Sequence, residues 1–428
     1  MRREAVRFAE VEPVVVTGIG VVLPGTVTVH DFWANLRDGR PQISRLRHLD
    51  LAGAPIRVAG QLGPFDHRPF LPELSDAHAK KYSREILATM CAVENARTDA
   101  AIAGQVDPER IGFIDSSSRG PIEWWDNAYR ADLGAPAAVT QTVSGEPMMA
   151  GLPGAAATFA AIYSGLRGMV TTLSAACVGG NHALSIATRE LQCGNADAML
   201  VGGHEFPLTA PILALYSSPG RSVLSRSEDP ASAMRPYDRR RDGFVMGEGA
   251  VVLCLERRAF AEARGARCYA DLLGYRHFNE AAHPAHMDLT GQATADLVTG
   301  LLQSVDRSAQ DVGYVCGHGT GTRYNDVAES RAMGLVFDAR GLSRPPLGSV
   351  KPIYGHLLGG AGILNVAATA LMLHHQILCP TVNCDDPDPE CGPDHVTGGP
   401  RRSDLEVAVS LSFALGSQCS AVALGRAG

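Results

Sequence analysis

Residues 171–203, TTLSAACVGGNHALSIATRELQCGNADAMLVGG, contain an extended run, a cysteine, paired glycines and then a segment with helical apolar spacing. The last seven residues are a short apolar run bounded by turn residues, which is typical of a buried strand. The stretch therefore predicts strand, turn, helix and strand, with Cys177 where the first strand gives way to the helix. Unpaired N–H groups at such a helix N-terminus lower the pKa of a thiol and can hold an oxyanion, although a cysteine can equally pack as a small apolar side chain.

The same alternation of apolar runs, glycine-rich turns and helical spacing continues on both sides of this stretch. Residues 13–22, 249–256, 313–317 and 407–413 predict buried strands, and residues 182–192 and 361–373 predict helices. This pattern is typical of a layered α/β fold. A charged, helix-like segment at residues 257–267 separates two halves with similar alternation, so we predict one half over residues 1–257 and a second over residues 258–428.

Composition and charge exclude several classes of protein. The 428 residues include 38 Lys and Arg against 45 Asp and Glu, a formal charge of -7, so no basic surplus is present to neutralise a nucleic acid. Acidic residues interrupt the N-terminal segment before any apolar core, which argues against a secretory signal. The longest apolar run, residues 361–373, is too short to span a bilayer. We expect a cytoplasmic protein that binds neither nucleic acid nor membrane.

The cysteine, histidine and glycine patterns predict no disulfide, metal or nucleotide cofactor. The ten cysteines form no CxxC pair. After its first few residues, most of the segment 371–400 predicts a long surface loop, and its cysteines and histidines match no paired zinc spacing. Residues 18–25, GIGVVLPG, lack the GxGxxG spacing of a dinucleotide site, and the sequence has no P-loop.

Two histidines stand in settings that match each other. His318 lies in CGHGTGT, residues 316–322, and His356 lies in VKPIYGHLLGGAG, residues 350–362. Each has glycine beside it, as a loop at a strand end requires, whereas an isolated histidine is more often a core or surface residue. A cysteine nucleophile with two imidazoles is the equipment for acyl transfer through a stabilised oxyanion or carbanion.

Seven ordered motifs carry a resemblance to a known family. The chain resembles the β-ketoacyl-acyl carrier protein synthases, the elongating ketosynthases of the thiolase superfamily. The matching segments run nearly from end to end: VVVTGIGVVLPG (14–25), the turn around Cys177, RPYDRRRDGFVMGEGA (235–250), HGTGTRYNDVAE (318–329), SVKPIYGHLLGGAG (349–362), PTVNCDDPDPEC (380–391) and SFALGSQC (412–419).

The resemblance implies a fold, a reaction and partners. The fold would be the thiolase-like five-layered αβαβα arrangement of two related halves, with the nucleophile in the first and both histidines in the second. The reaction would be a decarboxylative Claisen condensation of an enzyme-bound acyl group with malonyl-acyl carrier protein. Substrates would arrive on the phosphopantetheine of an acyl carrier protein, with no other cofactor. The enzyme would be a homodimer, or a heterodimer with a subunit like a chain-length factor.

The resemblance also assigns roles to individual residues. Cys177 would be acylated, and neutral His318 and His356 would donate to the malonyl thioester carbonyl and stabilise the enolate formed as CO₂ leaves. Lys351 would support the site electrostatically, with Glu329 as its buried partner.

Further residues would complete the site. The backbone N–H groups of Cys177 and Leu415 would form the oxyanion hole, and the Leu415 side chain would stand at the gate of the acyl pocket. Thr320 and Thr322 would hold the pantetheine arm, and Asp326 would support the loop that carries His318, here called the histidine loop.

Several positions depart from the family's pattern, among them residues 416–419, where GSQC replaces a Gly-Gly pair followed by Thr-Asn. Leu415 stands where many fatty-acid enzymes have a phenylalanine gate, Asn365 replaces a commonly found glutamate, and Asp288 stands where a pantetheine-contacting threonine is common. The segment HGTGTRYND is more similar to ketosynthases of type II polyketide and polyene systems. We therefore expect a type II polyketide or polyene pathway, with a fatty-acid pathway as the alternative.

Two other functions stay open at the level of sequence. A non-catalytic partner subunit that shapes an acyl tunnel would typically lack the nucleophile. A thiolase-like or thioesterase-like enzyme would act without decarboxylation, and thiolases usually carry a second active-site cysteine.

Two clusters of residues receive no catalytic role from the resemblance. The arginines at residues 235–241 are expected on a solvated face, with docking of an acidic carrier protein as the alternative. Trp124 and Trp125 are expected in the core or at a dimer contact.

Overall fold

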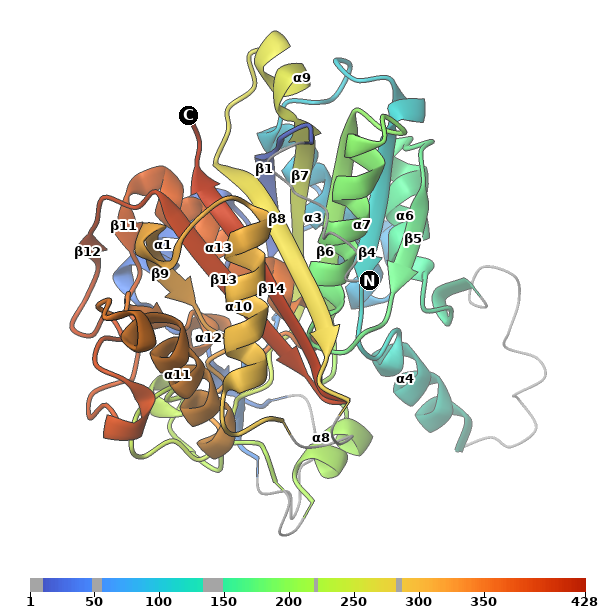
Figure 1. The fold of residues 1–428 in the computed structure, drawn as a ribbon. Helices are drawn as coiled ribbons and strands as arrows, with labels where there is room; N and C mark the ends of the chain where they lie inside the picture. Colours follow the sequence, from blue (N-terminus) through green and yellow to red (C-terminus); the bar gives the residue numbers. More distant parts are fainter. Residues whose placement is uncertain (1–10, 48–55, 134–148, 219–221, 282–286) are drawn as a thin grey trace.

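A sheet of ten hydrogen-bonded strands forms the centre of the part of the chain that the structure describes (Figure 1). The structure is a computed structural model that describes residues 11–47, 56–133, 149–218, 222–281 and 287–428. Each half of the chain contributes five strands: β1 (Val14–Val22), β4 (Ile111–Ser116), β5 (Val170–Leu173), β6 (Ala198–Glu205) and β7 (Gly249–Arg257), then β8 (Ala270–Asn279), β9 (Val312–Cys316), β10 (Leu347–Gly348), β13 (Val407–Ala414) and β14 (Gln418–Arg426). Two short ribbons lie outside this sheet: β2 (Ser44–Arg45) with β3 (Val58–Ala59), and β11 (Ile377–Leu378) with β12 (Arg401–Arg402).

The two halves of the sheet have the same topology. The strand order is β1-β7-β6-β4-β5 in the first half and β8-β14-β13-β9-β10 in the second. In each half the first three strands of this order pair antiparallel, and the last three pair parallel. The halves join where β1 and β8 pair antiparallel at residues 14–16. The expected duplication is present in the fold, while the division at residue 257 stays a prediction.

Helices form three layers: one lies between the two halves of the sheet, and one covers the outer face of each half. In the middle layer, α7 (Gly179–Gln192) and α13 (Ala361–His375) contact each other and strands of both halves. On the first half, α3 (Arg84–Asp99) and α6 (Ala155–Ser164) contact each other and the strands. On the second half, α10 (Gln292–Ser304) packs on β8 and β14, and α11 (Arg323–Phe337) packs on α10. The helix, sheet, helix, sheet, helix order is the predicted five-layered fold. The remaining helices are α1 (Val29–Asp38), α2 (Asp76–Ala79), α4 (Ile122–Leu133), α8 (Ala210–Tyr216), α9 (Arg258–Ala263) and α12 (Lys351–Tyr354).

The middle layer is apolar because sheet covers it on both sides. Residues 361–373 of α13 are all buried, as expected for a helix that is apolar on every face. Glycines allow the layers to come close: a Cβ placed on Gly203 of β6 would lie 2.6 Å from the Cα of Gly360. The glycine run that follows His356 can therefore lie against the sheet of the first half.

The predicted strands and helices are confirmed, with boundaries that shift by a few residues. Two segments differ from expectation. Of the charged segment 257–267, only α9 is helical. Residues 371–400 do lack long elements after α13, but they are not wholly at the surface, because Cys379, Cys384 and Cys391 anchor the segment in the core. The N-terminal segment considered above lies largely outside the described residues.

None of the described helices has both the length and the apolar character that crossing a membrane requires.

Candidate active site

Cys177 lies in the turn between β5 and α7. The residue before it, Ala176, has a φ of 46°, a left-handed conformation that costs a non-glycine residue energy and is common at functional turns. Ser412, on β13 in the other half of the chain, donates a 2.8 Å hydrogen bond to the Cys177 carbonyl oxygen. The backbone around the nucleophile is therefore held by both halves of the protein.

The three residues predicted to carry chemistry come together in space. The Cys177 Sγ lies 3.3 Å from the His356 Nε2, and the rings of His318 and His356 have centroids 5.3 Å apart at an interplanar angle of 82°. One ring nitrogen of each histidine and the cysteine sulfur lie within 4.8 Å of one another. The predicted nucleophile from one half of the chain therefore meets two imidazoles from the other.

The proton on His356 is placed by its backbone neighbours. The Leu358 N–H donates to His356 Nδ1 at 3.3 Å, so Nδ1 is an acceptor and the proton of a neutral ring sits on Nε2, which faces the sulfur. The backbone of His356 is itself held by Val245, whose carbonyl accepts at 2.7 Å, and by Gly247, whose N–H donates at 3.0 Å. Val245 and Gly247 belong to the motif at residues 235–250, so this motif helps to orient the His356 ring.

Burial sets the charge state of the site. It holds the pKa values of His318 and His356 well below their usual value, and the positive charge of Lys351 lowers both further. Both rings are therefore neutral at physiological pH. Burial also raises the pKa of the Cys177 thiol to about 12, against the opposing charges of Lys351 and Arg119. The lowered thiol pKa expected from a helix N-terminus is thus wrong, because desolvation outweighs that effect.

His318 is positioned through its backbone rather than through its ring. Its N–H and that of Gly319 donate to the Glu329 carboxylate, and Tyr237 donates its hydroxyl to the same group at 3.0 Å. Lys351 donates from Nζ to the His318 carbonyl oxygen. Glu329, expected as the buried partner of Lys351, is buried and acts on the Lys351 charge electrostatically, but the two side chains form no direct ion pair among the described residues. The backbone of the histidine loop lies between the two groups and satisfies each of them.

The other predicted support residues also hold this loop. Asp326 accepts a 2.8 Å hydrogen bond from the Tyr237 N–H. Thr320 and Thr322 are joined by a hydrogen bond of 2.8 Å between their hydroxyls. Asn365 donates from Nδ2 to the carbonyls of Gly317 and Leu411, which a glutamate carboxylate in its place could not do. Pantetheine binding by the two threonines stays a prediction.

Leu415 stands in the tight turn between β13 and β14. Its side chain is 57% exposed, and the turn continues through Gly416 and Ser417, both with positive φ. Asn279 donates to the Gly416 carbonyl at 2.6 Å, which ties the turn to the end of β8. A role of its backbone N–H in an oxyanion hole remains a prediction.

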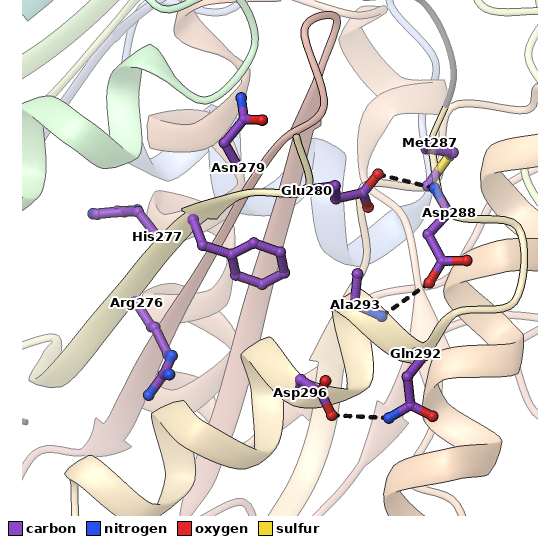
Figure 2. Close-up of a pocket in the computed structure, with 10 residues that line it drawn as sticks. Arg276, His277, Asn279, Glu280, Met287, Asp288, Gln292, Ala293 and Asp296 are labelled. Carbon is purple, nitrogen blue, oxygen red and sulfur yellow. Dashed lines mark hydrogen bonds between the residues drawn. The ribbon is translucent and has the colours of Figure 1, made fainter. Parts of the chain in front are cut away.

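A cavity of about 700 Å³ lies beside this turn, between the end of β8 and the start of α10 (Figure 2). Asp288 lines it, and its carboxylate accepts from the N–H of Ala293 at 3.0 Å and of Thr290 at 2.9 Å. Asp288 therefore caps the first turn of α10. None of Cys177, His318 and His356 lines this cavity, so it is separate from the catalytic cluster.

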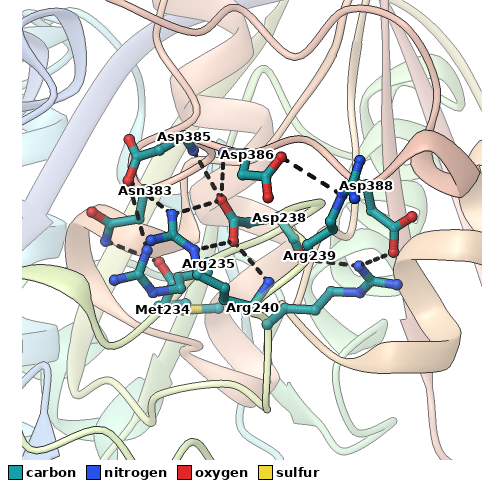
Figure 3. Close-up of polar contacts among 10 residues, drawn as sticks. Met234, Arg235, Asp238, Arg239, Arg240, Asn383, Asp385, Asp386 and Asp388 are labelled. Carbon is teal, nitrogen blue, oxygen red and sulfur yellow. Dashed lines mark hydrogen bonds and ion pairs between the residues drawn. The ribbon is translucent and has the colours of Figure 1, made fainter.

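The arginine cluster is only partly solvated (Figure 3). Asp238 is fully buried at its centre and accepts from Arg240 and from the backbone N–H groups of Asp385 and Asp386. The side chain of Arg241 is only 4% exposed and pairs with Asp388 at 2.7 Å. The solvated-face prediction was therefore wrong for Arg241, because the segment 383–388 covers it.

Sequence reasoning missed several residues near the nucleophile. Buried Glu205, at the end of β6, accepts the N–H groups of Ser118, Arg119 and Gly359 at 2.8–3.0 Å. It thereby joins the loop after β4 to the loop after His356. The sequence did contain a signal for Glu205, because a glutamate at the end of a largely apolar strand is unusual. Arg119 and Tyr216 had no such signal.

Cys177, His318 and His356 also have the ligand types that a zinc ion would take. A metal bound there would occupy the sulfur lone pair that a nucleophile needs, so metal binding and acylation would exclude each other. Absence of a resident metal stays a prediction.

Models of two protein domains match the chain. The model for the N-terminal domain of β-ketoacyl synthases matches residues 11–261, and that for the C-terminal domain matches residues 269–385.

Individual proteins match over almost the full length. The chain is 33% identical over 424 residues to the tetracenomycin polyketide synthase ketoacyl synthase alpha subunit of Streptomyces glaucescens, covering 98% of each chain. It is 32% identical over 409 residues to 3-oxoacyl-acyl-carrier-protein synthase 2 of Synechocystis, covering 95% of this chain and 96% of that one. A solved type II polyketide ketosynthase in complex with its acyl-carrier protein has a TM-score of 0.84 at 28% identity, covering 98% of this chain and 100% of that one.

Proposed function

Since this chain belongs to the β-ketoacyl synthase family, we propose that Cys177, His318 and His356 carry out its two half-reactions. The chain is an acyltransferase that condenses an acyl group with malonyl-acyl carrier protein by decarboxylative Claisen condensation, in a type II polyketide or fatty-acid pathway. The observation that carries the assignment of residues is the 3.3 Å contact between Cys177 Sγ and His356 Nε2, made across the two halves of the fold.

In the first half-reaction, the Cys177 sulfur attacks the thioester of an acyl-pantetheine. The Cys177 thiol gives up its proton and the departing pantetheine thiolate takes one, so the step needs no net base. Because the pKa of the Cys177 thiol is raised, thiolate forms only as the attack proceeds, and the His356 Nε2–H stabilises it. The backbone N–H groups of Cys177 and Leu415 would receive the negative oxygen of the tetrahedral intermediate.

In the second half-reaction, the malonyl thioester loses CO₂ and its carbonyl becomes an enolate. Neutral imidazoles of His318 and His356 donate to that oxygen, and Lys351 adds a positive charge behind the His318 backbone. The enolate carbon attacks the acyl-Cys177 carbonyl, the carbon–sulfur bond breaks, and the Cys177 thiolate regains a proton from solvent. One carbon–carbon bond forms for each CO₂ released.

The partners are an acyl carrier protein, which carries both substrates on phosphopantetheine, and a second ketosynthase-type subunit. Thr320 and Thr322 would hold the pantetheine arm, and we propose that no other cofactor takes part. The half-exposed edge strand β5 directly follows exposed Met169, which suits a dimer contact beside the turn that carries Cys177. We also propose a cytoplasmic location, which the ten free cysteines support.

A non-catalytic partner subunit is the alternative function. The complete set of Cys177, His318 and His356 in hydrogen-bonding and ring contact disfavours it, because a subunit that only shapes a tunnel has no use for an oriented nucleophile.

The test is intact-mass spectrometry of the protein after incubation with acyl-acyl carrier protein thioesters of different chain lengths. An acyl adduct is expected on the native protein and not on the Cys177→Ala variant. An adduct that persists in Cys177→Ala would overturn the assignment of the nucleophile. No adduct from any donor, with the partner subunit supplied, would favour the non-catalytic alternative.

A further inference from the structure

Arg119 and Tyr216 form a polar edge on the apolar cluster beside Cys177. The cluster contains residues of α8, the segment 244–246 and Leu358, and Cys177 and Tyr216 pack against it. Arg119 lies in the loop after β4. Its Nη2 donates to the Tyr216 hydroxyl, and its guanidinium carbon lies 5.3 Å from the centroid of the Tyr216 ring.

Successive contacts connect this pair to the reacting atoms. The Tyr216 ring meets the Phe244 ring edge-on at 6.0 Å, and Phe244 meets the His356 ring at 5.1 Å. His356 in turn contacts the Cys177 sulfur. The Arg119 backbone is fixed in the same frame, because Glu205 accepts both its N–H and that of Gly359. The pair therefore lies close to Cys177, at the edge of the apolar cluster against which both Cys177 and Tyr216 pack.

Arg119 retains hydrogen-bonding capacity that its surroundings do not use. Its Nε is buried and has no hydrogen-bond partner, and its guanidinium makes no ion pair with a carboxylate, within the residues that the structure describes. Buried N–H donors in native proteins are almost always satisfied. A saturated alkyl chain would leave this donor without a partner, whereas an oxygen acceptor on the ligand would satisfy it.

We infer that Arg119 and Tyr216 bind an oxygen acceptor on the acyl chain carried by Cys177. The preferred acyl group then bears a keto or carboxylate oxygen, and a saturated chain of the same length is the poorer substrate. This inference rests on the proposed role of Cys177 and names the substrate class of the same site.

The experiment compares three acyl groups of equal carbon number on one carrier protein: butyryl, acetoacetyl and succinyl. The rate of adduct formation on Cys177 is measured by intact mass for each donor. Native protein is expected to favour acetoacetyl or succinyl over butyryl, and the comparison of these two distinguishes a keto from a carboxylate ligand. Arg119→Met should reduce that preference by about 10- to 100-fold, as expected for loss of hydrogen bonds to a charged group.

Further variants separate recognition from folding. Tyr216→Phe keeps the ring and removes only the hydroxyl, so the preference should fall by about 2- to 10-fold. Arg119→Lys keeps the charge and should retain part of a preference for succinyl. Arg167→Met, at an exposed arginine, is the matched control and should leave the preference unchanged.

Three outcomes would overturn the inference: no preference in the native protein, a preference that survives Arg119→Met, or an equal loss of rate for all three donors in that variant. The last would mean that Arg119 only supports the structure around Cys177. Absence of any adduct in the native protein is a different result, because it would refute the proposed function together with this inference.

Discussion

Replacement of His356 by alanine should slow condensation far more than acylation. In acylation, the His356 Nε2–H makes one hydrogen bond to sulfur at 3.3 Å, and loss of a single such bond costs about 0.5–1.5 kcal/mol, or roughly 2- to 13-fold in rate. In condensation, the same donor faces a developing enolate, and loss of one preorganised oxyanion donor typically costs about 100- to 1,000-fold. The ratio of the two rates should therefore change by about tenfold or more.

The assay measures the two steps separately on one preparation. Acyl adduct formation is followed by intact mass, and consumption of malonyl-acyl carrier protein is then followed after the free donor has been removed. His374→Ala, at the far end of α13, is the matched control and should leave both rates unchanged. Equal losses in both steps, or a larger loss in acylation, would refute the role assigned to His356.

Three further predictions concern charge and stability. The rate of Cys177 alkylation by iodoacetamide should rise about tenfold per pH unit between pH 7 and 9, because burial raises the thiol pKa to about 12; a plateau near neutral pH would contradict this. Glu205→Ala should lower the free energy of unfolding by about 3 kcal/mol or more, since three backbone N–H groups lose their acceptor, and Glu205→Gln should cost less; equal urea midpoints for all three proteins would contradict the role of Glu205. Although burial opposes it, Asp115 raises the pKa of His204 to about 9, so the stability that His204 contributes is present below about pH 6.5 and lost as pH rises through 9, a loss of about 3 kcal/mol. The difference in unfolding free energy between native protein and His204→Gln should shrink accordingly from pH 6 to pH 10, and a constant difference would contradict the linkage.

Local patterns were enough to predict the strand and helix framework and to single out the three residues that we propose are catalytic. Buried strands and the apolar helix at residues 361–373 appear in the sequence as short apolar runs, because both faces of the sheet are covered. Cys177, His318 and His356 could be singled out because each stands in a small-residue turn next to a predicted element. Their assembly depends on the duplicated topology, which brings the starts of α7 and α13 together.

Contacts that depend on long-range geometry could not be predicted. The resemblance suggested Glu329 as the buried partner of Lys351, but not that both groups would bind the His318 backbone, which lies between them. The charge of Arg241 gave no sign of its burial, because the covering segment is more than a hundred residues away in the chain. The contact of Arg119 with Tyr216 could not be predicted either, because the two residues are far apart in the sequence.

The most direct test of the central claim is a single-turnover measurement of native protein preloaded with an acyl group on Cys177 and mixed with malonyl-acyl carrier protein. We predict that each acyl group lost from Cys177 yields one CO₂ and one β-ketoacyl-acyl carrier protein, and that Cys177→Ala yields no such product. Loss of the acyl group as free acid without a carbon–carbon bond, or product formed by Cys177→Ala, would contradict the account.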